Sequence, residues 1–133
     1  MARFLLDTNV CIEIVRGRNE ALMECLNRHR FEDFSICTVV WAELVTGARL
    51  AENFAKARKN PGAFESLPSF PFDMAAAEQY AKIRAELHRQ GRIIGANDLM
   101  IAAIALEKEL TLVTHNTREF SRVSGLAIED WQI

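Results

Sequence analysis

Three carboxylates and one amide occupy positions at which this chain could do chemistry. Asp7 and Asn116 each come directly after a short apolar segment that predicts a buried strand. Glu43 and Asp98 lie in the first turns of two predicted helices. In a parallel sheet, ligands bind beyond the carboxyl ends of the strands, where Asp7 and Asn116 would emerge together. We therefore predict that residues from four distant parts of the chain converge on one hollow.

Carboxylates crowded into a hollow repel one another unless protons or cations compensate their charge. Hard oxygen ligands favour Mg²⁺ or Mn²⁺. Such an ion lowers the pKa of bound water and stabilises charge on a phosphoryl oxygen. The sequence contains no P-loop and no GxGxxG, GxSxG or HExxH motif. The pattern thus favours metal-dependent phosphodiester hydrolysis over nucleotide binding or acyl transfer.

Each acid also has a purely structural interpretation. Asp7 could serve only as a helix cap, and Asp98 only as an acid in a first helical turn. Glu43 could complement a helix N-terminus, an effect of roughly 0.3–1 kcal/mol. Its neighbours are Trp41, Leu44 and other apolar residues, among which an unpaired carboxylate is costly. No single position decides between the two interpretations.

The elements that must position these residues alternate between strands and helices. We predict strands at 4–6, 34–37, 70–72, 110–114 and 126–128. Helices are predicted to start after Asp7 and after capping residues at Thr38, Asp73 and Asn97, and the second of these helices should continue through Gly47. Breaks in the helical pattern are predicted near 17, 61–62 and 91. The segment 99–106 is apolar almost all round, so its helix should be central and buried. This order predicts one α/β domain over residues 1–133, with a small, mainly parallel central sheet flanked by helices.

Composition sets limits on the partners. The 133 residues are 50% hydrophobic, enough for a proper core, and 16 Lys and Arg stand against 18 Asp and Glu, a net charge of −2. This balance excludes binding of nucleic acid through a general surplus of positive charge. The three cysteines form no CxxC pair and the three histidines are scattered, so we expect core thiols and no zinc site. Asp7 interrupts the initial apolar run, and no later run can span a bilayer, so we expect a cytoplasmic protein without a membrane segment.

Four sequence blocks occur in order, at suitable separations, and together they resemble a known family. They are Leu6-Asp7-Thr8-Asn9, Ala42-Glu43-Leu44-Val45-Thr46-Gly47, Ile94-Gly95-Ala96-Asn97-Asp98-Leu99-Met100-Ile101-Ala102 and Val113-Thr114-His115-Asn116-Thr117-Arg118-Glu119-Phe120. With them, the chain resembles the PIN-domain ribonucleases, specifically the VapC toxins of bacterial toxin–antitoxin pairs. The resemblance covers essentially the whole length. It implies a PIN-like fold and a magnesium-dependent endoribonuclease, for which Mn²⁺ is a substitute ion.

The resemblance assigns roles to particular residues. Asp7, Glu43 and Asp98 match the three family acids, so they inherit catalytic and metal-binding roles. Asn116 takes a fourth catalytic position that is often Asp in the family. Because its amide adds no negative charge, the site could bind either one or two metal ions. Glu119 is a candidate substitute there. The hydroxyls of Thr8 and Thr114 are expected to support the metal ligands without binding the ion.

The resemblance and the sequence also suggest partners. Arg118 and Arg122 follow Asn116 closely, and we expect both to contact RNA phosphates. Arg16 and Arg18 are further candidates. Each of the four arginines can equally well be interpreted as a solvated cation at a helix end. Similar toxins are homodimers, some within larger complexes, neutralised by a VapB-like antitoxin. Relatives cut tRNA or rRNA, and the closeness to chains ending in Glu-Asp-Trp favours initiator tRNA.

Three other functions compete with this interpretation. A haloacid-dehalogenase-like phosphatase would need an acid at position 9, where this chain has Asn9. A structure-specific DNA nuclease with a related fold is a nearer alternative. Asn116 also motivates a catalytically degenerate PIN domain that binds RNA or a partner without cleaving, although the three retained acids favour an enzyme.

Overall fold

The computed structural model describes residues 1–133 and contains one five-stranded sheet. The spatial order is β3-β2-β1-β4-β5, and every neighbouring pair is parallel. The strands are β1 (Phe4–Leu6), β2 (Phe34–Cys37), β3 (Ser69–Phe70), β4 (Thr111–Val113) and β5 (Ile128–Glu129). The predicted α/β fold with a parallel central sheet is confirmed. The structure goes further, since no strand is antiparallel.

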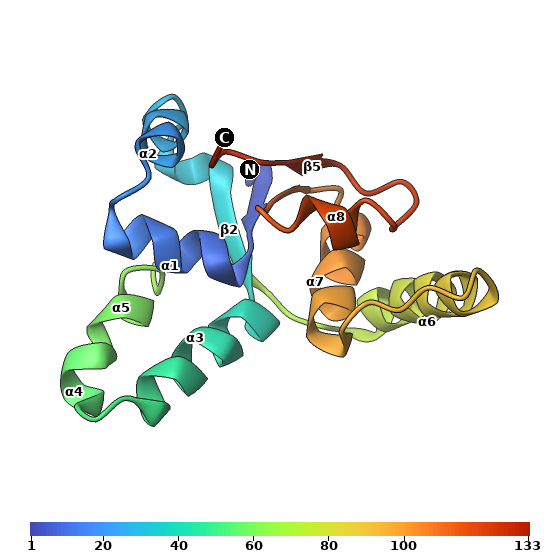
Figure 1. The fold of residues 1–133 in the computed structure, drawn as a ribbon, viewed down its shortest axis with the longest axis horizontal. Coiled ribbons are helices and arrows are strands. Elements are labelled where there is room, and N and C mark those ends of the chain that lie inside the picture. Colours follow the sequence, from blue (N-terminus) through green and yellow to red (C-terminus); the bar gives the residue numbers. More distant parts are fainter.

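Eight helices and one short 3₁₀ turn, Phe31–Asp33, connect the strands. The helices are α1 (Thr8–Arg16), α2 (Glu20–Asn27), α3 (Thr38–Leu50), α4 (Phe54–Ala57), α5 (Lys59–Gly62), α6 (Met74–Arg89), α7 (Ala96–Glu107) and α8 (Thr117–Phe120). Figure 1 shows α1 and α2 on one side of β1 and β2, and α6 and α7 on the other, while α3 to α5 extend away from the carboxyl edge of the sheet. None of the helices combines the length and apolar character required to cross a membrane.

The core forms between the sheet and α7, as the apolar pattern of 99–106 predicts. All residues of β1 and β2 are buried, and Leu5 is completely inaccessible to solvent. In α7 the buried residues run from Ile101 to Ala105 without interruption. An apolar helix and two strands buried on both faces are typical of a covered parallel sheet. This central packing fixes the ends of β1, β4 and α7 relative to one another.

Three predicted boundaries are wrong, and each has a local physical reason. Cys37 rather than Thr38 precedes the first turn of α3, since Thr38 is already helical. Gly95 rather than Asn97 caps α7, because its carbonyl accepts the Leu99 N–H at 2.9 Å, and the helix begins at Ala96. Pro61 lies inside α5 instead of breaking it. A short helix tolerates a proline in its first turn because the N–H groups there have no intrahelical acceptor.

The remaining differences are small shifts in the limits of three strands, two of which, β3 and β5, lie at the edges of the sheet. The predicted strand 70–72 is observed as β3, over Ser69–Phe70, and the predicted strand 126–128 as β5, over Ile128–Glu129. Strand 110–114 shortens to β4. Edge strands have a partner on one side only, so register with that partner decides their limits.

Candidate active site

Asp7 is the buried acid at the carboxyl edge of the sheet. β1 pairs with β4 so that Leu6 lies opposite Val113, and the next residues of the two strands, Asp7 and Thr114, therefore meet. The carboxylate oxygen Oδ2 of Asp7 accepts a hydrogen bond from the Thr114 hydroxyl at 2.8 Å, and Oδ1 accepts one from the Thr8 backbone N–H at 2.8 Å. Only 4% of Asp7 is exposed. Both oxygens are thus held in fixed directions.

Glu43 is joined to this edge through Thr8. The Thr8 hydroxyl donates to Oε1 of Glu43 at 2.6 Å and so links the start of α1 to α3. The side-chain amide of Asn97 donates to Oε2 of Glu43 at 3.5 Å. The sequence predicted Asn97 only as a helix cap, and its contact with Glu43 was missed. Its place beside Asp98 in the first turn of α7 was the one available signal.

The acids interact electrostatically although they come from different elements. Burial raises the pKa of Asp7, and the charge of Glu43 raises it further, against hydrogen bonds from Thr114 and Thr8 that lower it. Burial also raises the pKa of Asp98, to about 6, with the charges of Asp7, Glu119 and Glu43 contributing. Repulsion of this kind acts only between groups that are close together. The structure therefore brings Asp7, Glu43 and Asp98 into one acidic cluster.

Asn116 and Glu119 complete the edge of the cluster. The backbone N–H of Asn116 donates to the Thr114 hydroxyl oxygen at 3.0 Å, and its side-chain amide donates to Oε2 of Glu119 at 3.2 Å. Asn116 thereby fixes Glu119, whose charge acts on Asp98. The amide oxygen of Asn116 makes no hydrogen bond to another side chain, so it is free to hold a water molecule. Its own catalytic role stays a prediction.

The donor set fits a hard cation that keeps part of its water shell. The charges of Asp7, Glu119 and Glu43 all act on the carboxylate of Asp98, so the cluster offers oxygen donors from several elements. No three His, Cys, Asp or Glu side chains are gathered as a ready-made metal site. Mg²⁺ ordinarily takes one or two protein carboxylates and several waters, which matches this arrangement, whereas zinc takes three or four direct nitrogen, sulfur or carboxylate ligands.

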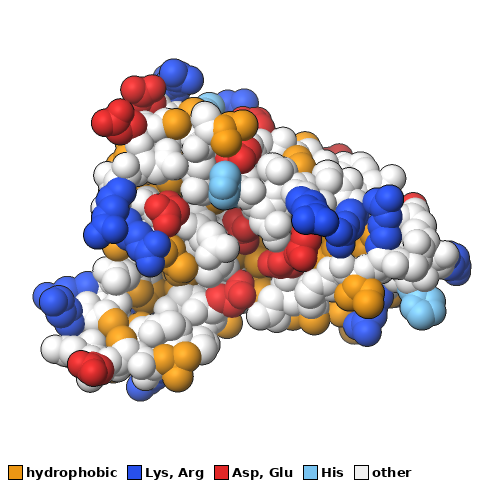
Figure 2. All heavy atoms as spheres, viewed as in Figure 1, with side chains coloured by type: hydrophobic (Ala, Val, Ile, Leu, Met, Phe, Trp, Pro, Cys, Tyr) orange, Lys and Arg blue, Asp and Glu red, His pale blue; other side chains and the backbone are white.

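Two of the four arginines predicted to contact RNA line the same pocket, and the other two do not. Arg118 and Arg122 line one pocket next to α8, together with Arg92. Arg16 instead pairs with Glu13 at 3.0 Å on the exposed surface of α1, and Arg18 is exposed in the turn after that helix. Figure 2 shows acidic side chains near the centre of one face and a row of basic side chains beside them. The structure therefore groups two of the four predicted arginines with one that the sequence did not single out.

Comparisons with known proteins agree with this geometry. The family model described as PIN domain matches residues 4–126. The chain is 40% identical to a protein of Shigella flexneri named tRNA(fMet)-specific endonuclease VapC, over 98% of this chain and 99% of that protein. It superposes with a TM-score of 0.90 on a chain of the DNA-bound VapBC structure from Salmonella typhimurium, which is 36% identical, with 98% and 99% of the two chains covered.

A second solved complex gives the same result at lower identity. A chain of VapBC2 from Rickettsia felis, bound to a DNA fragment from its promoter, is 30% identical and superposes with a TM-score of 0.85, over 96% of this chain and 98% of that chain. The residues matched by the PIN domain model, 4–126, span the positions of the acidic cluster. The chain belongs to the PIN-domain family and, within it, to the VapC ribonucleases of toxin–antitoxin systems.

Proposed function

We propose that this chain is a magnesium-dependent endoribonuclease that acts as the toxin of a toxin–antitoxin pair and cleaves a structured RNA, with initiator tRNA as its first candidate. The observation that carries the proposal is the buried Asp7, with both carboxylate oxygens held and within electrostatic reach of Glu43 and Asp98. The name of the Shigella flexneri relative, a tRNA(fMet)-specific endonuclease, supports the choice of RNA. Cleavage of that RNA would arrest translation.

Asp7 and Asp98 would hold Mg²⁺, directly or through water, with Mn²⁺ as a substitute, and Glu43 would help to hold it. When bound, Mg²⁺ supplies Lewis-acid chemistry, which favours deprotonation of water and stabilises charge on phosphoryl oxygens. Mn²⁺ could replace Mg²⁺ because oxygen ligands suit both ions.

The chain's own residues hold the acids in position for this chemistry. The hydroxyl of Thr114 orients Asp7, and the hydroxyl of Thr8 orients Glu43. Glu43 keeps acceptor capacity beyond its contacts with Thr8 and Asn97, so it can orient an attacking water. Hydrogen bonds to both oxygens of a carboxylate fix its orientation, and holding reacting groups in a fixed orientation favours hydrolysis.

Asp98 links this chemistry to pH. Its pKa of about 6 leaves it mainly ionised at neutral pH, the form that attracts a cation. Below pH 6 the carboxyl is protonated and its affinity for a cation falls. We therefore expect an acid limb near pH 6 in the metal dependence of cleavage.

The partners are part of the same proposal. Two solved structures with this fold are VapBC complexes, which supports a VapB-like antitoxin as the partner of this chain. We further expect a homodimer, within a larger toxin–antitoxin complex, in the cytoplasm. Co-expression with a cognate antitoxin should relieve growth arrest.

The test compares Asp7→Asn and Asp98→Asn with the unmodified protein on initiator tRNA, elongator tRNA, an rRNA fragment and flap DNA. We expect Mg²⁺-dependent cleavage of RNA, and a loss in both variants that exceeds the roughly 10–100-fold cost of altering residues behind a metal ligand. Both variants should remain folded by circular dichroism. Full activity in both would refute the assignment, and preference for flap DNA would favour the DNA nuclease.

A cellular experiment separates an enzyme from a degenerate binding domain. Brief induction, followed by sequencing of RNA 5′ ends, should reveal one dominant cleavage site that is absent with Asp7→Ala. Growth arrest that persists unchanged with Asp7→Ala would instead indicate binding without cleavage.

A further inference from the structure

A pocket of about 520 Å³ opens between α8 and the segment that precedes α7. Arg92, Arg118 and Arg122 contribute three positive charges to its lining; we call these three residues the arginine triplet. The other lining residues are Gly91, Ile93 and Ser121. No acidic residue lines the pocket, although the chain as a whole carries a net charge of −2. Three positive charges in a pocket without an acidic lining residue, on a chain of negative net charge, favour binding of an anionic ligand at this pocket.

The guanidinium groups of the arginine triplet have no acidic partner. None of the four ion pairs in the structure involves them. Arg92 and Arg118 are exposed and donate no side-chain hydrogen bond within the chain, whereas Arg122 donates from Nη1 to the Ile93 carbonyl at 2.9 Å. Arg122 therefore ties the segment before α7 to the C-terminal side of α8. The donors of the other two are available to a ligand.

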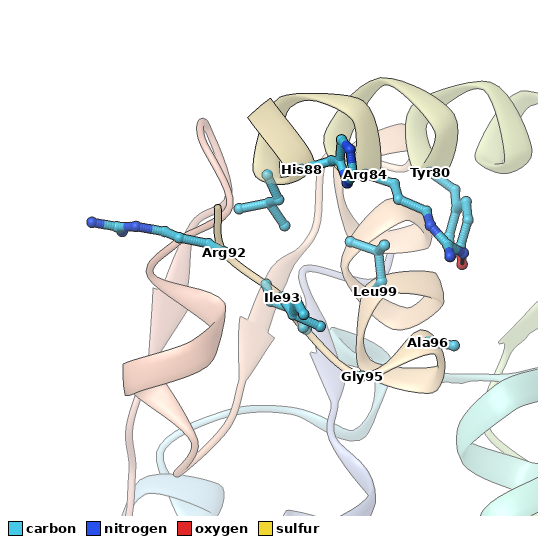
Figure 3. Close-up of a pocket in the computed structure, with 10 residues that line it drawn as sticks. Tyr80, Arg84, His88, Arg92, Ile93, Gly95, Ala96 and Leu99 are labelled. Atoms are coloured by element: carbon cyan, nitrogen blue, oxygen red, sulfur yellow. Dashed lines mark hydrogen bonds between the residues drawn. The ribbon is translucent and has the colours of Figure 1, made fainter. Parts of the chain in front are cut away.

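The pocket adjoins the acidic cluster at two points. Arg118 is the neighbour of Glu119 in α8, and Glu119 acts on Asp98. A second cavity of about 380 Å³ shares Arg92 and Ile93 with the pocket and extends to the first turn of α7, where Asp98 lies. Figure 3 shows the side chain of Arg92 leaving this second cavity on the side of α8. The arginine triplet is therefore next to Glu119 in the chain and shares a cavity wall with the first turn of α7, so an RNA strand bound at the acidic cluster would lie near the triplet.

We propose that the arginine triplet binds a backbone phosphate of the RNA strand next to the bond that is cleaved; the proposal rests on the ribonuclease function proposed above. The planar guanidinium group presents paired N–H donors that match phosphate oxygens, and such charge-assisted hydrogen bonds are about twice as strong as neutral ones. Phosphate contacts fix register without reading sequence. The triplet positions the strand, and the acidic cluster carries out the chemistry.

An acidic protein segment is the competing ligand, since carboxylates also fit guanidinium groups. Position favours RNA, because the triplet lies beside the acidic cluster, and a phosphodiester strand must reach that cluster in order to be cleaved. Ile93 adds an apolar contact, because its side chain is 83% exposed between the two cavities and can pack against a ribose or base.

The test measures binding of a fluorescent RNA hairpin to full-length protein at several salt concentrations, in an Asp7→Asn background that prevents cleavage. Arg92→Gln and Arg118→Gln avoid the structural hydrogen bond of Arg122. Each should weaken binding roughly two- to fivefold, the scale of an exposed ion pair, and reduce the salt slope by about one. Arg28→Gln, an equal change of charge at the end of α2, should leave both unchanged.

The same variants in the active protein should raise KM for RNA cleavage and leave kcat nearly constant. Binding and salt slope unchanged in both variants would overturn the proposal. So would weakened binding of a poly-glutamate peptide with RNA binding intact, which would identify an acidic protein segment as the ligand. If the unmodified chain cleaves no RNA yet both variants lose RNA binding, the phosphate site stands and the ribonuclease function fails.

Discussion

Replacing Asp98 by Asn should stabilise the metal-free protein while abolishing its activity. Burial and the charges of Asp7, Glu119 and Glu43 raise the pKa of Asp98 from 3.8 to about 6. A carboxyl whose pKa is higher in the folded state binds its proton more tightly there, so ionisation opposes folding. At about 1.36 kcal/mol per pKa unit the full shift corresponds to about 3 kcal/mol. Solvent screening of a half-buried group reduces this to roughly 1–2 kcal/mol.

The sign of the effect defines the pH window. Below about pH 4 Asp98 is protonated in both the folded and the unfolded chain, and Asp98→Asn should have little effect. As the pH rises from 4 to 6, the unfolded chain releases this proton first, and the unmodified protein loses stability relative to the variant. Above pH 6 the difference should be constant. Asn keeps the shape of the side chain and removes the repelled charge.

Urea denaturation in EDTA across this pH range measures the difference directly, and Glu52→Gln on the exposed turn after α3 controls for the loss of one negative charge elsewhere. Added Mg²⁺ should stabilise the unmodified protein and have a smaller effect on Asp98→Asn. A variant less stable than the parent at pH 7.5, or a difference independent of pH, would refute this view of the acidic cluster.

Two further substitutions test the support of the cluster and its core. Thr114→Val removes the 2.8 Å hydrogen bond to the buried Asp7, so it should cost about 1–3 kcal/mol in urea denaturation and raise the pKa of Asp7 further. Thr114→Ser keeps the hydroxyl and should restore the parental stability, and an unchanged stability with Val would contradict this. Phe120→Ala creates a cavity at a residue of α8 that has no solvent exposure, so it should lower the free energy of unfolding, measured by urea denaturation, by about 3–5 kcal/mol. A decrease of less than about 1 kcal/mol would contradict tight packing around this side chain.

Much of the fold follows from local patterns in the sequence. Segments 4–6 and 34–37 are apolar, or nearly so, and end in capping residues, and both are strands in the structure. The caps Asp7 and Asp73 are confirmed, because each accepts a hydrogen bond from a backbone N–H in the following helix. Such signals depend on neighbouring residues alone. The predicted cap at Asn97 is wrong because α7 begins at Ala96 after Gly95, which leaves Asn97 inside the first turn, where its amide contacts Glu43, a contact that no local pattern contains.

The meeting of the acids was predictable from topology, but the contacts around them were not. Parallel strands place Asp7 and Thr114 at one edge whatever their side chains do. The hydrogen bond from Asn116 to Glu119, and the repulsion that Glu119 exerts on Asp98, depend on side-chain positions that only the folded chain fixes. Sequence order therefore indicated which acids take part, and only three-dimensional packing shows how they influence one another.

Charge placement explains how a chain with a net charge of −2 can meet an anionic RNA. Asp7, Glu43 and Asp98 concentrate negative charge at one sheet edge, where burial and, after it, repulsion between the acids raise the pKa of Asp98 and oppose folding. A bound cation removes both the repulsion and the barrier to an approaching phosphodiester. The arginine triplet lies beside this edge rather than within it, so it would attract the proposed RNA strand without neutralising the acids proposed to hold the ion. Net charge averages over these two neighbouring sites, and their separation would permit RNA binding and metal binding on the same face.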